Sequence, residues 1–321
     1  MIRRRGVLNM PRQQCAGAVL MVKPAAFGYN PETAATNHMQ KPGEEAEAPA
    51  NERALLEFAT LVRALESEGI AVCVVEDTPS PAKPDAVFPN NWVSFHEDGT
   101  LVLYPMQALS RRTERRPEVI AAALRRVGFQ ARRTLDLTHH ESGGRFLEGT
   151  GSLVLDHVNR VAYAALSART HPALVEEWAR EMGYEALMFE TRDADGAPLY
   201  HTNVLLCIGA RLIVVGTQSI APGDRARVLE HLSASGREVI ELRPSEVERF
   251  AGNMLELATW DEALGDSHVL VMSAGARAAL SVETFGRLNA CTDTTLAVPV
   301  PTIEELGGGG VRCMLAEVFV A

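Results

Sequence analysis

NVLLCIGARLIVVG (residues 203–216) decides the fold, because it places two short apolar runs on either side of the turn signal Gly209-Ala210. Apolar runs joined by so short a turn predict a β-hairpin. A stretch with helical spacing, DRARVLEHLSASG (224–236), comes next, and another apolar run, EVIELRP (238–244), follows it. The segment therefore predicts one unit of strand, strand, helix and strand.

The same order of elements recurs along the chain. Hairpins are expected over residues 91–106, 151–166 and 252–275, and the helices that follow them over residues 114–129, 172–184 and 275–288. The four expected hairpins begin at Asn91, Gly151, Asn203 and Asn253, and a final strand begins at Cys313. The intervals between these starting points are 60, 52, 50 and 60 residues. Such a period with one order of elements predicts an internal repeat and a closed radial array.

The fifth unit is completed by the two ends of the sequence. ELGGGGVRCMLAEVFVA (305–321) finishes in an alternating apolar run, AGAVLMVKP (16–24) is an apolar strand, and residues 51–77 supply a helix and a return strand. The last strand should therefore pair with the first and close the ring. The alternative is that the final run is only an edge strand. The expected domain spans residues 16–321, with residues 1–15 as an N-terminal extension.

Composition narrows the class of protein. With 321 residues, 46% of them hydrophobic, the chain can bury a sizeable core. A net charge of −10 argues against nucleic acid or anionic lipid as the main partner. The sequence has no secretory signal and no apolar stretch that would span a membrane, so a cytoplasmic protein is expected. Five cysteines without CxxC spacing predict neither a disulfide framework nor a zinc site.

Polar residues gather where the hairpins begin. In a radial array these positions converge on one central cavity, and a thiol, an imidazole and a carboxylate there would suit nucleophilic catalysis with acid/base assistance. Glycines before Cys313 would leave its sulfur unobstructed, and Arg312 would favour the thiolate. Taken singly, each could be a buried core residue or a turn. The candidates are Asp85, Asn90, Asn91, Glu148, His201, Asn203, Asn253, Arg312 and Cys313.

Five motifs carry a resemblance to a known family. FPNNW (88–92), LEGTGS (147–152), SART (167–170), HTN (201–203) and GGGGVRC (307–313) resemble, in order, the motifs of the pentein or guanidino-group-modifying superfamily. Residues 24–40 and 84–92 resemble its amidinotransferase-like, citrulline-utilization hydrolase branch. The resemblance implies an α/β fold, a five-bladed β/α propeller with pseudo-fivefold ββαβ repeats.

The resemblance also implies a site and a mechanism. Cys313 would be the nucleophile, His201 the general acid/base, and Glu148 a carboxylate that contacts the substrate nitrogens and the histidine. The thiolate would attack the planar carbon of a guanidino or ureido group, ammonia or an amine would leave, and water would hydrolyse the covalent intermediate. Neither a metal nor another cofactor is expected.

The substrate is expected from two departures from the deiminase pattern. Where the deiminases resembled here have aspartates, this sequence has Asn91 and Asn203. Amides suit a neutral ureido group, whereas a buried guanidinium would lose its compensating charge. We therefore expect citrulline to be hydrolysed to ornithine, ammonia and carbon dioxide. One alternative is that arginine is the substrate, if Asp85 or Glu148 supplies enough charge. Another is amidino transfer from arginine or a substituted arginine to an amine. A third is that the protein is an inactive binding scaffold.

Further residues are expected to anchor a small amino-acid substrate. Arg169 resembles the residue that grips an α-carboxylate, and Arg112, or its neighbour Arg111, resembles a second one; the alternative for this pair is a solvated helix start. Adjacent His139 and His140 are expected to point apart and to lack a third metal ligand. Whether the chain forms a homodimer stays open.

Overall fold

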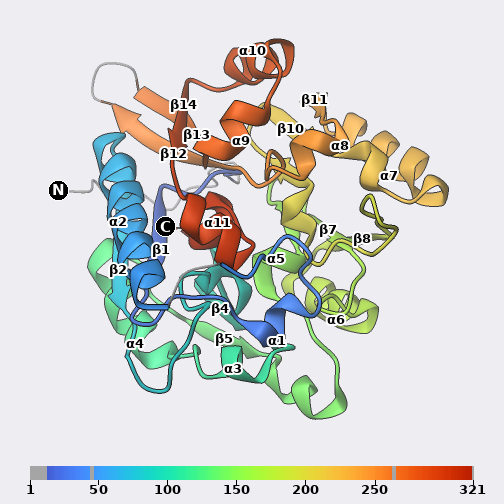
Figure 1. Cartoon of the computed structure of the whole chain (residues 1–321). Coiled ribbons are helices and arrows are strands. Elements are labelled where there is room, and N and C mark those ends of the chain that lie inside the picture. Colours follow the sequence, from blue (N-terminus) through green and yellow to red (C-terminus); the bar gives the residue numbers. More distant parts are fainter. Residues whose placement is uncertain (1–12, 44–46, 262–264, 320–321) are drawn as a thin grey trace.

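A computed structural model describes residues 13–43, 47–261 and 265–319 (Figure 1). In these residues fifteen strands form five sheets of three strands each. Each sheet has an antiparallel pair of strands and a third strand parallel to the middle one. The predicted unit of strand, strand, helix and strand is therefore confirmed in each of the five sheets.

In order along each unit, the sheets are β15 (Ala316–Val318), β1 (Ala18–Lys23) and β2 (Ala71–Glu76); β3 (Val93–Phe95), β4 (Thr100–Leu103) and β5 (Arg133–Asp136); β6 (Val154–Asp156), β7 (Val161–Ala165) and β8 (Glu185–Phe189); β9 (Leu206–Ile208), β10 (Leu212–Val215) and β11 (Glu238–Glu241); and β12 (Leu255–Asp261), β13 (Gly265–Ser273) and β14 (Thr294–Val298). The tip of the last hairpin, residues 262–264, lies outside the described residues.

A helix connects the second strand of each unit to the third. These helices are α2 (Glu47–Ser67), α4 (Pro117–Leu124), α6 (Pro172–Met182), α7 (Pro222–Ala234) and α10 (Val282–Cys291). They lie at the periphery, whereas α5 (Gly149–Ser152) and α11 (Pro301–Gly307) lie near the centre of the view (Figure 1). Other connections contain α1 (Pro31–Ala34), α3 (Leu109–Arg112), α8 (Pro244–Val247), α9 (Ala274–Ala279) and 3-10 turns.

The first and last described strands close the arrangement. β15 pairs antiparallel with β1, with Ala18 opposite Val318 and Leu20 opposite Ala316, so the predicted pairing of the two ends is confirmed. Neighbouring units also touch: β15 contacts β3, α5 contacts β3, β6 contacts β9, β9 contacts β12, and β13 contacts the turn 311–314. The contacts between units therefore run from the first unit round to the fifth and back to the first.

Helix α6 shows how the sequence builds one unit. Proline at its first position and Gly183 just past its end, in the left-handed region at φ 68°, are typical start and stop signals. The side chains of Leu174, Trp178 and Met182, at intervals of four, are buried against the sheet of β6, β7 and β8. Trp178 also donates a hydrogen bond of 2.9 Å to the Tyr104 hydroxyl, which ties the helix to the preceding unit.

The strands begin later than the sequence predicts. Asn91, Gly151, Asn203 and Cys313, which were expected to start strands, lie instead in single helical turns, and each strand begins two or three residues further on. A helical turn of three or four residues is too short to show a periodicity, which explains the error. Because each turn lies before its strand, the side chains of these residues are set apart from the sheet.

The start of the expected domain also differs in detail. Gln14, assigned above to the N-terminal extension, is buried and donates hydrogen bonds to the carbonyl oxygens of Leu155 and Ile208 at 2.9 and 3.1 Å. Cys15 is buried as well. Residues 1–12 of the extension lie outside the described residues.

Candidate active site

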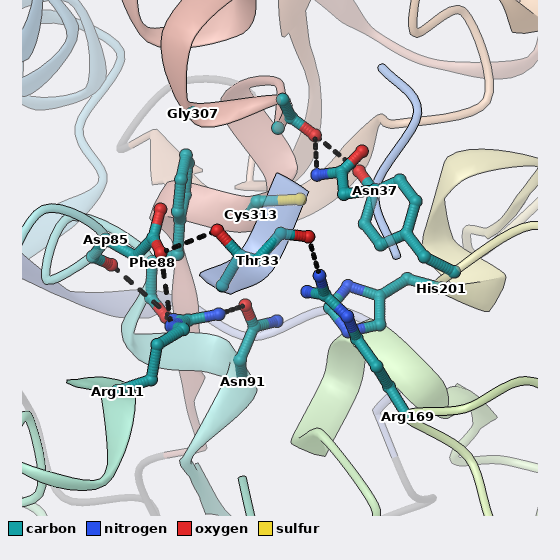
Figure 2. Close-up of a pocket in the computed structure, with 13 residues that line it drawn as sticks. Thr33, Asn37, Asp85, Phe88, Asn91, Arg111, Arg169, His201, Gly307 and Cys313 are labelled. Atoms are coloured by element: carbon teal, nitrogen blue, oxygen red, sulfur yellow. Dashed lines mark hydrogen bonds and ion pairs between the residues drawn. The ribbon is translucent and has the colours of Figure 1, made fainter. Parts of the chain in front are cut away.

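A small cavity lies where the helical turns before the strands meet (Figure 2). Its wall includes Asn91, His201 and Cys313, each from the turn that precedes the first strand of a different unit. Thr33, in α1, and Asn37, just after α1, line it from the connection that follows β1. The cavity measures about 10 Å³, which is room for about one water molecule.

Glu148 and His201 form a buried pair. Oε2 of Glu148 lies 2.9 Å from Nε2 of His201, and both side chains are almost completely buried. Burial alone would raise the pKa of Glu148, but Arg169 and His201 outweigh it and hold this pKa well below its ordinary value. The carboxylate is therefore charged and accepts the hydrogen bond. Glu148 does not itself line the cavity; it lies next to His201 and Arg169.

Burial sets the protonation state of His201, and its pairing with Glu148 sets which ring nitrogen carries the proton. Burial lowers the pKa of His201 to about 4, although the hydrogen bond to Glu148 opposes this. The imidazole is neutral at pH 7. Because a charged carboxylate can only accept, Nε2 carries the proton, and Nδ1 has the free lone pair that a general base needs.

The Cys313 sulfur lies between two amides. Nδ2 of Asn253 is 3.3 Å from it and Nδ2 of Asn203 is 3.7 Å from it. Burial raises the pKa of the thiol, and the hydrogen bond from Asn253 and the charge of Arg312 oppose this only in part. Arg312 therefore favours the thiolate, as the sequence suggested, but burial has the larger and opposite effect on this pKa. The guanidinium of Arg312 is itself paired with Glu317 at 2.8 Å.

Asp85 and Arg111 form the opposite side of the cavity. Asp85 accepts hydrogen bonds from Nδ2 of Asn30 at 2.7 Å and from the Thr33 hydroxyl at 3.2 Å. Burial raises the pKa of Asp85, although Arg111, at 4.0 Å, opposes it. Arg111 is held by Glu114 through two contacts of 3.0 Å, and its Nη1 donates to Oδ1 of Asn91 at 2.8 Å.

Of the expected anchor arginines, Arg169 lines the cavity and Arg112 does not. Arg169 donates from Nη2 to the carbonyl oxygen of Thr33 at 2.6 Å (Figure 2). Arg112 donates to the carbonyl oxygen of Met106 at 3.0 Å and pairs with Glu141 at 3.4 Å. The expectation for Arg112 is therefore corrected: adjacent residues on helix α3 point about 100° apart, and Arg111 is the one that faces the cavity.

The glycines of the motifs make room for these side chains. A Cβ on Gly151 would lie 2.6 Å from Nδ2 of Asn91 and 2.7 Å from Nδ1 of His201. Gly308 is in the left-handed region at φ 61°, and its carbonyl oxygen accepts hydrogen bonds from Asn37 at 3.0 Å and from the Tyr200 hydroxyl at 2.5 Å. The glycine run is thus an ordered wall of the cavity.

Several residues of the site were missed or left without a role by the sequence analysis. Asn253 was noted as polar, and its place in the repeat, 50 residues after Asn203, was a signal that could have assigned it to the sulfur. Thr33 and Asn37 come from a loop without periodicity, so nothing in the residue pattern predicts that they reach the cavity.

The structure also corrects the interpretation of His139 and His140. Both lie in the 3-10 turn Thr138–Gly143, and their ring centroids are 4.0 Å apart with a tilt of 37°, so the rings do not point apart. A third potential ligand is present, because Oε2 of Glu177 on α6 lies 2.9 Å from Nε2 of His140. None of the three lines the cavity described above.

Solved structures of low sequence identity share the fold. The N-terminal domain of ArgZ, described as an arginine dihydrolase of the ornithine-ammonia cycle in cyanobacteria, matches with 17% identity and a TM-score of 0.70 over 94% of this chain and 98% of that one. AgrE in complex with L-arginine matches with 17% identity and a TM-score of 0.71 over 94% of this chain and 40% of that one. DDAH from Pseudomonas aeruginosa in complex with citrulline matches with 17% identity and a TM-score of 0.65 over 94% of this chain and 99% of that one.

These likenesses show that the chain, with its five sheets, shares the fold of these proteins. The family model for N,N dimethylarginine dimethylhydrolase, eukaryotic, matches residues 23–320. The chain therefore belongs to this family and is a hydrolase that acts on carbon–nitrogen bonds other than peptide bonds. No curated protein matches the sequence. Among the described residues, no helix has the length and apolar character to cross a membrane.

Proposed function

We propose that the protein hydrolyses the terminal C–N bond of a ureido amino acid, with citrulline as substrate and ornithine, ammonia and carbon dioxide as products. The observation that supports this most directly is the surroundings of the Cys313 sulfur, which lies beside two neutral amides, Asn203 and Asn253. Amides can donate to a carbonyl oxygen and accept from an amino group, which are the groups that a ureido end presents.

The first half of the reaction uses the neutral imidazole. His201 Nδ1 takes the proton of the Cys313 thiol, and the sulfur attacks the ureido carbon. As the tetrahedral adduct collapses, the imidazolium returns this proton to the terminal nitrogen, which leaves as ammonia. A thiocarbamate joins Cys313 to the substrate carbon. Glu148, charged and bonded to Nε2–H, stabilises the imidazolium that forms between these steps.

The second half regenerates the thiol. His201 Nδ1 takes a proton from water, the hydroxide attacks the thiocarbamate carbon, and the C–S bond breaks with return of the proton to sulfur. The product is the carbamate of the ornithine side-chain amine, which decomposes to the amine and carbon dioxide. The balance is one citrulline and one water for one ornithine, one ammonia and one carbon dioxide.

The two charged ends of the substrate have partners in the cavity wall. Asp85 is a buried carboxylate that suits the α-ammonium group, and Arg169 suits the α-carboxylate. Arg169 now donates to the Thr33 carbonyl, so substrate binding exchanges this hydrogen bond for one to a carboxylate.

Arginine is the second candidate, and a specific observation favours it. Within the described site, Asp85, Glu114 and Glu148 are three carboxylates against the two cations Arg111 and Arg169, which leaves one negative charge when all ionise. A guanidinium would neutralise that charge. Two structural neighbours, ArgZ, described as an arginine dihydrolase, and AgrE, solved in complex with L-arginine, agree with this candidate.

The arrangement of the sheets belongs to the same proposal. We propose that the five sheets are the blades of a five-bladed β/α propeller whose axis passes through the cavity. The contacts between neighbouring units and the pairing of β15 with β1 support this arrangement. A central axis explains why turns from different units supply one site.

The experiment that tests the function compares citrulline, arginine, agmatine and dimethylarginine side by side, with ornithine, citrulline and ammonia as measured products. We expect the highest kcat/KM with citrulline, a covalent adduct on Cys313 in quenched reactions analysed by mass spectrometry, and no turnover by Cys313→Ala. Cys291→Ala, which removes a thiol far from the cavity, should retain activity. Ornithine formation from arginine but not from citrulline would overturn the choice of substrate. Amidino transfer to glycine would overturn hydrolysis itself.

A further inference from the structure

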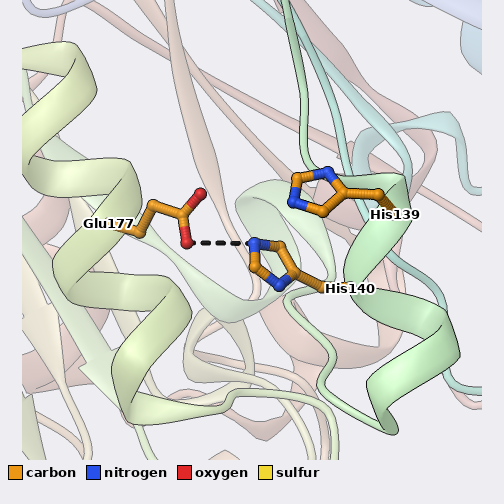
Figure 3. Close-up of side chains that lie close together, drawn as sticks. All are labelled: His139, His140 and Glu177. Carbon is orange, nitrogen blue, oxygen red and sulfur yellow. Dashed lines mark ion pairs between the residues drawn. The ribbon is translucent and has the colours of Figure 1, made fainter.

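We propose that His139, His140 and Glu177 bind a divalent transition-metal ion of the zinc type, at a site separate from the catalytic cavity. One potential ligand atom from each residue lies within 4.8 Å of the other two. Figure 3 shows both imidazole rings on one side of the turn 138–143, facing Glu177 on α6. The site thus joins a turn that follows β5 to a helix of the next unit.

The surroundings of His140 point to a missing ligand. Its side chain is only 8% exposed, and neither ring nitrogen makes a hydrogen bond to another described residue. Nε2 nevertheless lies 2.9 Å from Oε2 of Glu177. A buried imidazole without hydrogen bonds is costly, so such a group needs an explanation. An ion between Nε2 and the carboxylate would supply it.

His139 is oriented for the same purpose. Its Nδ1 lies 3.2 Å from the carbonyl oxygen of Asp136, which accepts the Nδ1–H bond and leaves Nε2 with a free lone pair. Histidines that bind metals in proteins usually donate their other ring N–H in this way. Because His139 is exposed, its ring can also move toward the other two ligands at little cost.

The chemistry of the three groups selects the ion. Two imidazoles and one carboxylate suit zinc, whereas magnesium and calcium prefer oxygen ligands alone. Ligands at about 2.1 Å in a tetrahedral arrangement lie about 3.4 Å apart. Nε2 of His140 and Oε2 of Glu177, now 2.9 Å apart, would therefore separate slightly to admit the ion, and the ligand atom of His139, within 4.8 Å of both, would move closer. Water would complete the coordination from the exposed side. The ion would cross-link the turn to α6 and stabilise the fold by mass action.

The test uses the full chain with Cys313→Ser, so that the catalytic thiol cannot bind the metal. We expect one equivalent of Zn²⁺ by isothermal titration calorimetry and a rise in Tm. Co²⁺ should give visible absorption of a four-coordinate ion without a thiolate charge-transfer band. In the same background, His139→Ala and Glu177→Gln should each weaken binding by at least about tenfold. The metal-free Tm of each variant checks that it is folded.

Glu176→Gln is the matched control, because Glu176 is the exposed carboxylate next to Glu177 on the same helix. It should leave Zn²⁺ affinity unchanged. The proposal is overturned if the Cys313→Ser protein binds no Zn²⁺, if His139→Ala and Glu177→Gln bind as tightly as their parent, or if Glu176→Gln loses affinity equally. None of these readouts depends on the substrate or on catalysis, so the result is independent of the proposed function.

Discussion

Nδ2 of Asn253 lies 3.3 Å from the Cys313 sulfur, although the two residues are 60 positions apart and belong to different units. The Asn253 amide comes directly before β12, and the thiol lies in the turn before β15. Hydrogen bonds to a charged group are worth about 1.5 to 3 kcal/mol, so this amide should favour the thiolate whenever it forms.

We therefore expect Asn253→Ala to slow the alkylation of Cys313 by a haloacetamidine by about tenfold or more at pH 7, because the thiolate loses a donor. The alkylation rate as a function of pH is the measurement, and the apparent pKa of the thiol should rise. Asn289→Ala, at an exposed asparagine on α10, is the control. Equal rates in all three proteins would show that the contact has no influence on the thiol.

The two amides that replace carboxylates should differ in effect. Oδ1 of Asn91 accepts a hydrogen bond from Arg111, so an aspartate there would be neutralised by that arginine. Asn203 donates to the carbonyl oxygen of Thr150 and to sulfur, so an aspartate there would present an unpaired charge to the substrate. We expect Asn203→Asp to raise the ratio of kcat/KM for arginine to that for citrulline by about tenfold, and Asn91→Asp to change it less. The reverse order would contradict this view of the site.

Substitutions of Arg169 and of Arg112 should have different effects on KM. Arg169→Lys replaces a forked donor in the cavity wall by a single charge, and we expect KM to rise by about tenfold. Arg112→Lys alters a residue outside the cavity wall that contacts Met106 and Glu141 among others, and KM should stay unchanged. If both variants raise KM to the same extent, the placement of Arg112 outside the site is wrong.

Acid should destabilise the fold through buried histidines. Burial lowers the pKa of His96 to about 4 and that of His157 to about 3. Above pH 6.5 these groups are neutral in both the folded and the unfolded protein, so the full stability is present. Below pH 6.5 these histidines bind protons in the unfolded chain but stay neutral in the folded protein. The free energy of unfolding therefore falls by about 1.4 kcal/mol per pH unit for each histidine until its pKa in the folded protein is reached.

Urea unfolding at pH 7, 6 and 5 measures this dependence. His157→Gln should reduce the slope by about one proton, whereas His38→Gln, at an exposed histidine, should leave it unchanged. A His157→Gln protein whose free energy of unfolding varies with pH as steeply as that of the unaltered protein would exclude this mechanism.

The sequence allowed the repeats and the closing strand pair to be predicted, because apolar periodicity reports which elements form and in what order. It did not predict the direction of neighbouring side chains. Arg111 and Arg112 are alike in sequence, and only the exact phase of α3 sends one into the cavity. His139 and His140 converge because a tight 3-10 turn carries them and Glu177 comes from another unit.

The protonation state of the Cys313 thiol also could not be predicted from the sequence. Arg312 is next to Cys313 in the chain, which suggested a thiolate, but the dominant effect is burial, which depends on residues from several units. A local sequence contains no measure of burial by distant segments. The same limit applies to the Thr33 loop, whose contact with Arg169 spans 136 positions.

The turn that holds Cys313 leads directly into β15, and the strand that pairs with β15 is β1, from the other end of the described chain. Under the proposed mechanism, assembly of that sheet is what would bring the Cys313 thiol to the other side chains of the site. A chain that has collapsed but has not yet joined these two strands would then contain all of those side chains and still be inert, so activity should appear late in folding, together with the final strand pairing.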